Sequence, residues 1–408
     1  MRYLHIHNAR LIDPARNLDQ VADVYVAEGR IKAIGHKPAS GEIEHSIDGT
    51  GQWLVPGLID LGGHLAEPGF AHKGSIASET RAACARGFTH VCALPDTKPV
   101  ADSSAVIQLI LEKAAKAGYA KVLPLGALTQ GLAGEQLASM VSLREAGCVA
   151  LSNARAPFKD SYVLRRVMEY AATYDIPVFL NPDDTALSAA GCMHEGTVAT
   201  RMGLTGIPRT AETIALAQML LLIEQTGVRA HISQISCARS LDMLRQARAG
   251  GLKITADTPL ANLVFTDEAV AGYNSQFNVR PPLRAESDRQ ALLAAVNAGE
   301  LAISTNHRPH EVAAKKATFS DAEPGMSMFD AFLPLALHLV AQGELQLQAL
   351  IRATTQLPAA VTGLQQTLAE GQWFNAALIN PDTERTFRRS QLLSKGRNSP
   401  VAGLTLKG

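Results

Sequence analysis

The polar residues that follow the short apolar segments of this chain are those whose types could carry out chemistry. The chain has 12 histidines, which is enough for a metal site if they stand in the right places. Hydrolysis at a metal centre needs imidazole and carboxylate ligands, because a divalent ion must exchange its hydration shell for lone pairs and negative charge. The residues at these positions are His64, Asp96, Asn153, Asn181, Gln234, Asn306, His307 and His310.

Half of these residues are amides, which suit a metal poorly. Asn and Gln are neutral, weak zinc ligands, and they do not help a metal to ionise a bound water. That water must fall from a pKa near 15.7 to roughly 7, which requires on the order of 12 kcal/mol of differential stabilisation. The residue types at these positions therefore indicate a poor site for a hydrolytic metal ion.

Eight short apolar runs alternate with longer segments of helical period from about residue 52 onward. The runs cover residues 54–61, 89–95, 121–128, 148–152, 176–180, 228–236, 252–258 and 301–305. The segments between them repeat apolar residues at i, i+3, i+4 and i+7, as amphipathic helices do. Eight buried strands alternating with helices favour an α/β fold of the (β/α)₈ TIM-barrel type over an open doubly wound sheet. In such barrels the chemistry sits after the strands, where the polar residues stand.

The two ends of the chain differ from the middle. Residues 1–54 and 363–408 carry short alternating runs punctuated by Gly, Pro and Asp, which indicates strands. We expect them to form the two parts of one small β-sandwich domain beside a barrel of residues 55–362. The sequence contains no internal repeat.

Composition excludes several classes of protein. Lys and Arg number 38 and so do Asp and Glu, so the chain offers no basic field for nucleic acid. The first residues lack the apolar core of a signal peptide, and no window approaches 18 uninterrupted apolar residues. The five cysteines are far apart and never in a C-x-x-C spacing, which indicates no disulfide framework. We expect a cytoplasmic protein that binds neither membrane nor nucleic acid.

Several motifs occur in one order along the chain. They are PGLIDLGGHLAEPG (56–69), LPDTKP (94–99), NVRPPLR (278–284), STNHRPH (304–310) and the tail SKGRNSPVAGLTLKG (394–408). Together they resemble the dihydroorotases of the amidohydrolase superfamily, and the resemblance extends over both strand-rich flanks and the barrel.

The resemblance implies that the chemistry of the family is lost. Active members read D-x-H-x-H-x-R-x-P-G after the first strand, whereas this chain has Gly62 at the first metal histidine, His64 at the second and Ala66 at the arginine that holds the substrate carboxylate. The remaining metal and catalytic positions hold Asn153 for the bridging aspartate, Asn181 and Gln234 for histidines, and Asn306 for the catalytic aspartate. Two substrate-binding asparagines are replaced by Asp96 and Arg280, while His310 is retained. The resemblance thus implies no zinc, no catalytic residue and no substrate site.

Some bacteria pair aspartate transcarbamoylase with a dihydroorotase homologue, and this chain resembles the non-catalytic partner. The resemblance implies a hetero-oligomer, six copies of each chain, in which the chain supports assembly and activity of the transcarbamoylase in pyrimidine biosynthesis. The loops around 66–80 and 307–325 are candidate docking elements, since they are long and free of catalytic constraint.

Two other functions stay open. The first is an active cyclic amidohydrolase with an atypical or mononuclear metal site around His64, His231, His307 and His310. The second is a sensor that binds a pyrimidine intermediate in the old pocket.

The sequence also gives plainer expectations for single residues. We expect the four amides to fill the cavity and to hydrogen-bond to one another without charge, rather than to form a new polar pocket. We expect His231 to be a core histidine, and Asp183 and Asp184 to cap the helix that follows them.

Overall fold

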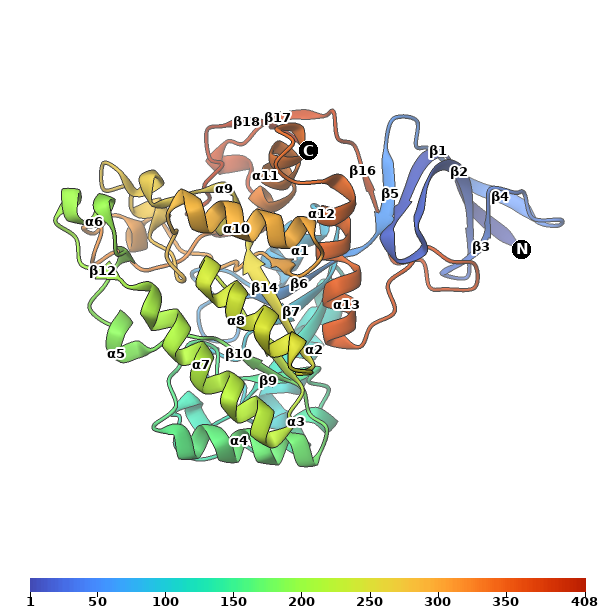
Figure 1. Cartoon of the computed structure of the whole chain (residues 1–408). Helices are drawn as coiled ribbons and strands as arrows, with labels where there is room; N and C mark the ends of the chain where they lie inside the picture. The colour runs from blue at the N-terminus through green and yellow to red at the C-terminus, as the bar shows by residue number, and fades with distance from the viewer.

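Eight short parallel strands form the wall of a barrel in the computed structural model, which describes residues 1–408 (Figure 1). They pair in the order β6 (Leu58–Gly63), β7 (Phe88–Ala93), β8 (Lys121–Ala127), β9 (Ala150–Ser152), β10 (Val178–Leu180), β13 (Ala230–Ile232), β14 (Ile254–Pro259) and β15 (Ala302–Ser304). Each of the eight predicted runs overlaps one of these strands, so the predicted barrel is confirmed.

Helices connect the strands and cover the outside of the barrel (Figure 1). The longer ones are α1 (Ile76–Cys84), α2 (Ser104–Ala117), α4 (Ser161–Thr173), α7 (Arg209–Thr226), α8 (Ala238–Ala249), α10 (Glu286–Asn297), α11 (Phe329–Ala341) and α12 (Leu347–Thr354). The shorter ones are α3 (Met140–Glu145), α5 (Thr185–Ser188), α6 (Thr197–Met202), α9 (Leu260–Val264) and α13 (Gln356–Thr362). No helix is long and apolar enough to cross a membrane.

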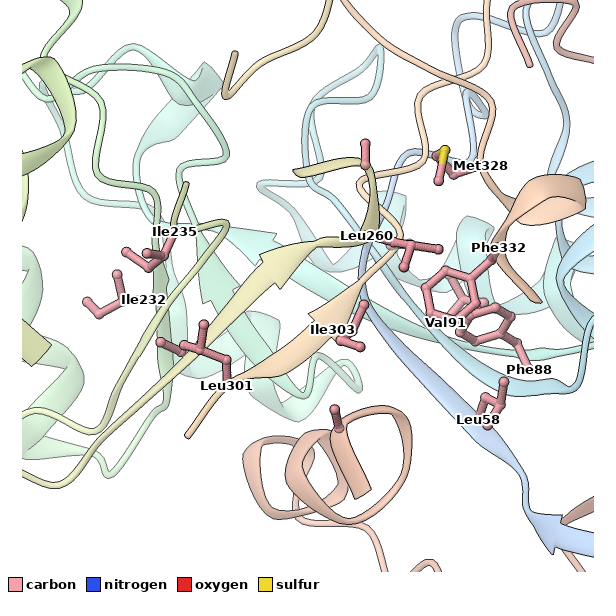
Figure 2. Close-up of a cluster of buried hydrophobic side chains, with 14 of the residues drawn as sticks. Leu58, Phe88, Val91, Ile232, Ile235, Leu260, Leu301, Ile303, Met328 and Phe332 are labelled. Carbon is pink, nitrogen blue, oxygen red and sulfur yellow. The ribbon is translucent and has the colours of Figure 1, made fainter. Parts of the chain in front are cut away.

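The main core lies between the barrel wall and its helices. Figure 2 shows part of it, where the rings of Phe88 from β7 and Phe332 from α11 lie together beside Val91. The two ring centroids are 4.9 Å apart in an edge-to-face arrangement, which aromatic pairs prefer. Both strands and helices here bury apolar side chains, as the sequence pattern predicts for a parallel sheet covered on its outer face.

The first and last strands of the barrel meet through side-chain and loop contacts. The Asp60 carboxylate of β6 accepts hydrogen bonds from the backbone N–H and the hydroxyl of Thr305, at 2.7 and 2.8 Å. The backbone N–H of His64 donates to the carbonyl of His307 at 2.8 Å. These bonds close the barrel where no strand pairing is present between β6 and β15.

The two ends of the chain contribute to one separate sheet. Its order is β16 (Ala376–Ile379), β5 (Trp53–Pro56), β1 (Arg2–Asp13), β2 (Leu18–Ala27) and β3 (Arg30–Ile34), and β4 (Glu42–Asp48) also pairs with β1. Gly57 alone separates β5 from the barrel strand β6, and a Cβ atom there would lie 2.2 Å from the side chain of Thr89. The first predicted run therefore covers two strands, one in each sheet.

The rest of the C-terminal segment returns to the barrel. Strands β17 (Glu384–Thr386) and β18 (Thr405–Lys407) form a hairpin, and β18 packs against α11. Ser394 and Lys395 hydrogen-bond to Glu79 of α1. Residues 363–408 thus divide between the terminal sheet and the barrel. The two remaining strands, β11 (Met193–His194) and β12 (Gly206–Ile207), pair with each other in the loop after β10.

Candidate functional site at the barrel mouth

The predicted site residues gather at the carboxyl ends of the barrel strands, a region called the barrel mouth below. Gly62, Asn181, Gln234 and Asn306 line one small pocket there, which follows from their places at or after β6, β10, β13 and β15. Gln234 and Asn306 adopt positive φ angles of 63° and 46°. Such backbone conformations are costly for residues other than glycine, and they concentrate at functional sites.

Arg155 lies at the centre of this cluster. Its guanidinium donates to the side-chain oxygen of Asn181 at 3.0 Å and to that of Gln234. The Asn181 amide donates to the same Gln234 oxygen at 3.2 Å, and the Gln234 amide donates to Asn306 at 3.0 Å. Asn306 in turn donates to the carbonyl of Arg280 at 2.8 Å. Three amides and one guanidinium therefore form a continuous hydrogen-bonded chain.

This arrangement corrects the expectation of four mutually bonded amides without charge. Asn153 is not part of the chain, because its oxygen accepts from Thr129 at 2.7 Å and its amide donates to the carbonyl of Ala156 at 3.1 Å. The side chains of the other three amides do hydrogen-bond to one another, but they lie around the Arg155 cation. Burial lowers the pKa of Arg155 to about 10, so the guanidinium is charged at neutral pH.

His64 faces a second charged pair across the barrel mouth. Its Nε2 lies 3.2 Å from the backbone carbonyl of Asp96, while its Nδ1 is buried and has no hydrogen-bond partner. Burial lowers the pKa of His64, so the ring is neutral at pH 7. The Asp96 carboxylate pairs with Arg308. Burial acts to raise the pKa of Asp96, but Arg308 and His64 outweigh this and the net shift is downward.

The three remaining residues at positions assigned to substrate binding are Ala66, Arg280 and His310. None of them presents a free polar group to the pocket. Ala66 is fully buried. The Arg280 guanidinium donates to the carbonyls of Ser188 and Gly191, the latter at 2.7 Å, and so ties down the loop after α5. His310 Nε2 donates to the carbonyl of Pro324 at 3.0 Å. Burial lowers the pKa of His310 to about 3, so this histidine is neutral at pH 7.

The other histidines considered for an atypical site are engaged in buried contacts. His231 Nε2 lies 2.8 Å from Asp257, and its Nδ1 lies 2.9 Å from the Thr255 hydroxyl, which is the core role expected for it. His307 Nε2 lies 2.9 Å from Glu79, and both side chains are fully buried. Neither ring turns a free nitrogen toward His64.

The barrel mouth does not fit a divalent metal ion. Two amide oxygens of its pocket already accept from Arg155, and the guanidinium itself repels a cation. The carboxylate of Asp257 also lines the pocket, but it is engaged by His231 and Ser304. Nowhere in the chain do three His, Cys, Asp or Glu side chains converge on a point where they could hold a metal. The residues present therefore do not form the ligand set that a hydrolytic metal ion needs.

The pocket is also small. About 30 Å³ of space remains between Gly62, Arg155, Asn181, Gln234 and Asn306. That volume is about the share of one molecule in liquid water. The pocket adjoins a larger cleft, with which it shares Arg155 and Asn181.

Sequence reasoning did not single out Arg155 or Arg308, the two cations of the barrel mouth. Both lie close to residues that the sequence did single out: Arg155 follows Asn153 in the loop after β9, and Arg308 lies inside the motif at 304–310. A charged residue near Asn153 and near Asn306 is the sequence signal for them. Glu79 was also missed, because its partners lie 228 and 315 residues away along the chain. Asp184 caps α5 as predicted, whereas Asp183 lies 3.9 Å from Arg155 and does not cap it.

Comparison with known proteins agrees with the motifs. A family model described as dihydro-orotase-like matches residues 51–240. The chain is 47% identical over 407 residues to the dihydroorotase-like protein of Pseudomonas aeruginosa, which covers 99% of this chain and 96% of that protein. The chain belongs to the dihydroorotase-like family.

Other members of the dihydroorotase-like family show the same coverage. A dihydroorotase-like protein of Pseudomonas putida is 46% identical over 99% of this chain and 96% of its own length. A dihydroorotase of Trichlorobacter lovleyi is 39% identical over the same shares. Among solved structures, the L-hydantoinase (dihydropyrimidinase) of Arthrobacter aurescens superposes with a TM-score of 0.87 at 20% identity, over 100% of this chain and 93% of that one. The last likeness shows the fold alone.

Proposed function

We propose that this chain is a catalytically inactive dihydroorotase homologue that supports the assembly and activity of aspartate transcarbamoylase in pyrimidine biosynthesis. The observation that carries the loss of activity is the Arg155 guanidinium, held between Asn181 and Gln234 at the barrel mouth. It places a fixed cation among the positions where the family resemblance puts metal ligands. On this proposal the protein needs no zinc or other cofactor.

The chemistry of the neighbouring residues supports the same conclusion. Asn306 has no ionisable carboxylate to act as a general base, and loss of such a group typically lowers a rate by about 10² to 10⁴. Ala66 removes the guanidinium fork that would hold a substrate carboxylate. The two relatives with 46% and 47% identity are named dihydroorotase-like protein, whereas the relative with 39% identity is named dihydroorotase.

The partner follows from the family resemblance and from the preserved scaffold. The barrel, its closing contacts and the terminal sheet are intact, although the chemical groups of the barrel mouth have been replaced. If the chain has no catalytic activity, its surface is the part of the molecule that can still contribute to function. We propose a cytoplasmic hetero-oligomer with the transcarbamoylase catalytic chain, with six copies of each.

Two sets of measurements, one on the chain alone and one with its proposed partner, test this function. The purified chain should show no turnover of dihydroorotate or carbamoyl aspartate with added zinc, and no stoichiometric zinc by elemental analysis. Aspartate transcarbamoylase from the same cell should co-elute with the chain and gain activity or stability from it.

Different results would select a different function. Turnover or stoichiometric zinc would favour the alternative of an active cyclic amidohydrolase with an atypical metal site. Separate elution, with equal transcarbamoylase activity in the presence and absence of the chain, would contradict the supporting role. Heat released on titration with dihydroorotate, without turnover, would indicate a sensor of pyrimidine intermediates.

A further inference from the structure

A cleft of about 340 Å³ adjoins the pocket of the barrel mouth and shares Arg155 and Asn181 with it. It lies between the loop after β9, the loop after β10 and helix α7, on the side of the barrel where α4, α5 and α7 lie (Figure 1). Its floor is apolar and includes the buried side chains of Leu164, Leu180 and Met219. A concave site of this volume with an apolar floor and a few polar groups is typical of small-molecule sites.

The ionisable groups that line the cleft are mostly acidic. They are the three carboxylates of Asp160, Asp183 and Asp184 and the guanidinium of Arg155. Asp160 accepts from the backbone N–H of Val163 at 2.9 Å and thereby caps α4. Asp184 caps α5 in the same way. The two helix N-termini at the cleft are therefore already matched by carboxylates, which leaves no strong site for an anion.

Asp183 differs from the other two carboxylates. It accepts no hydrogen bond within the chain, and the cation nearest to it is the Arg155 Nη1 at 3.9 Å, beyond hydrogen-bond distance. Arg155 directs donors to Asn181 and Gln234 instead. The Asp183 side chain is 18% exposed, so its oxygens can receive a donor from a molecule in the cleft.

One phenylalanine ring completes the lining. Phe158 lies in the loop after β9 and is partly exposed, whereas the ring of Phe179 on β10 is buried inside the barrel, where it contacts His231 at a centroid distance of 4.7 Å. The face of an aromatic ring attracts ammonium and guanidinium groups, and the attraction grows when the cation is partly desolvated. This ring and a carboxylate that accepts no hydrogen bond within the chain favour the same kind of ligand.

We propose that this cleft binds a small organic cation. Its ammonium or guanidinium group pairs with Asp183, and its apolar body packs on Met219 and Phe158. The net negative lining opposes an anion of the same shape. This inference does not depend on the proposed function, since neither metal chemistry nor a protein partner enters it.

Calorimetric titration with three probes of matched shape tests the charge preference. The probes are 2-phenylethylammonium, the neutral 2-phenylethanol and the anionic phenylacetate. We expect saturable binding of the cation, weaker binding of the alcohol and no saturable binding of the acid. Binding of phenylacetate as tight as that of the amine, or no saturable binding of the amine, would overturn the proposal.

Variants locate the site. Asp183→Asn keeps the shape but removes the charge, and should weaken amine binding by about five- to tenfold. Asp175→Asn is the matched control, because Asp175 is exposed, pairs with Arg229 and does not line the cleft. Ala186→Trp adds bulk at an exposed position of the lining and should abolish binding of the amine without altering the core. Unchanged affinity in both Asp183→Asn and Ala186→Trp would place the amine elsewhere.

Discussion

At the residue scale, Arg155 decides what the barrel mouth can hold. Two unit charges 4 Å apart repel by about 4 kcal/mol at an effective dielectric constant of 20, so a divalent ion at that distance from the guanidinium would be opposed by about 8 kcal/mol. The amide oxygens of Asn181 and Gln234 are neutral, and they accept hydrogen bonds from the guanidinium. The two amides and the arginine therefore fit one another, and the guanidinium disfavours a metal ion beside them.

Arg155→Met tests this fit. Methionine keeps most of the volume and limits the entry of water, but it leaves the oxygens of Asn181 and Gln234 without their strongest donor. We expect the free energy of unfolding to fall by about 1–3 kcal/mol, measured by urea titration. Arg165→Met on the exposed face of α4 is the matched control and should change it by less than about 0.5 kcal/mol. Equal stability of the Arg155 and Arg165 variants would show that the guanidinium does not organise the amides.

Gly62→His tests whether one restored imidazole revives the site. A Cβ atom at Gly62 would lie 3.3 Å from the Gln234 amide nitrogen, so the imidazole would have to displace Gln234. We expect a loss of stability of about 1–3 kcal/mol, as for other overpacked positions, and no hydrolysis of dihydroorotate. Catalytic groups act as a unit, so one of them alone restores little. Measurable zinc-dependent turnover from this single change would contradict the proposed inactivity.

The sequence predicts which residues occupy the former ligand positions, but it does not predict how they pair. The order of the apolar runs places Gln234 and Asn306 at the mouth. The hydrogen bond between them joins residues 72 positions apart, and Arg155 reaches across 79 positions to Gln234. Side-chain direction at the ends of separate strands depends on loop conformation, including positive φ angles at both amides. No periodicity in the sequence carries that information.

At the scale of elements, one buried carboxylate joins three distant segments. Glu79 of α1 accepts from the Ser394 hydroxyl and from the Lys395 N–H at 3.0 Å, and lies 2.9 Å from His307. Burial acts to raise the pKa of Glu79, but these partners outweigh it and the net shift is downward, so the carboxylate is charged at neutral pH. Asp330 of α11 accepts from the Ser394 N–H at 2.9 Å. The tail is thus fixed against the loop that follows β15.

Glu79→Gln should release this tail. An amide offers one acceptor oxygen in place of two and no charge, so we expect the free energy of unfolding to fall by about 1–3 kcal/mol. Trypsin should then cleave after Lys395 faster than in the parent protein, as seen by mass spectrometry. Glu112→Gln on the exposed side of α2 is the matched control. Unchanged stability and unchanged cleavage in the Glu79 variant would mean that other contacts hold the tail.

At the scale of the whole molecule, alternating apolar runs and helical periods predict the barrel because each strand needs burial on both faces. The pairing of β16 with β5 brings together residues more than 300 positions apart, and the strand-rich character of both ends was its only signal. The return of residues 384–408 to the barrel was not predicted, because β17 and β18 are short and mostly exposed and carry no apolar pattern. Their position is set by the tail contacts to α1 and α11.

Buried ionisable groups distributed over the molecule should make its stability depend strongly on pH. Burial lowers the pKa of His90 and of His194 to about 4 and that of His310 to about 3. An unfolded histidine titrates near 6.5, so below that pH the unfolded chain takes up about three protons that the folded chain refuses. Asp60 acts in the opposite sense, because burial raises its pKa to about 6 and the folded state gains one proton.

The net difference is about two protons between pH 6 and pH 5, so the free energy of unfolding should fall by about 2–3 kcal/mol over that interval. Urea titrations at the two pH values measure it. In His90→Gln the fall should shrink by about 1.4 kcal/mol, since one of the refused protons is gone. His36→Gln alters an exposed ring and should leave the fall unchanged. Stability that is constant or rises from pH 6 to pH 5 would contradict the burial of neutral histidines, because protonation of Asp60 would then be the stronger of the two opposed effects.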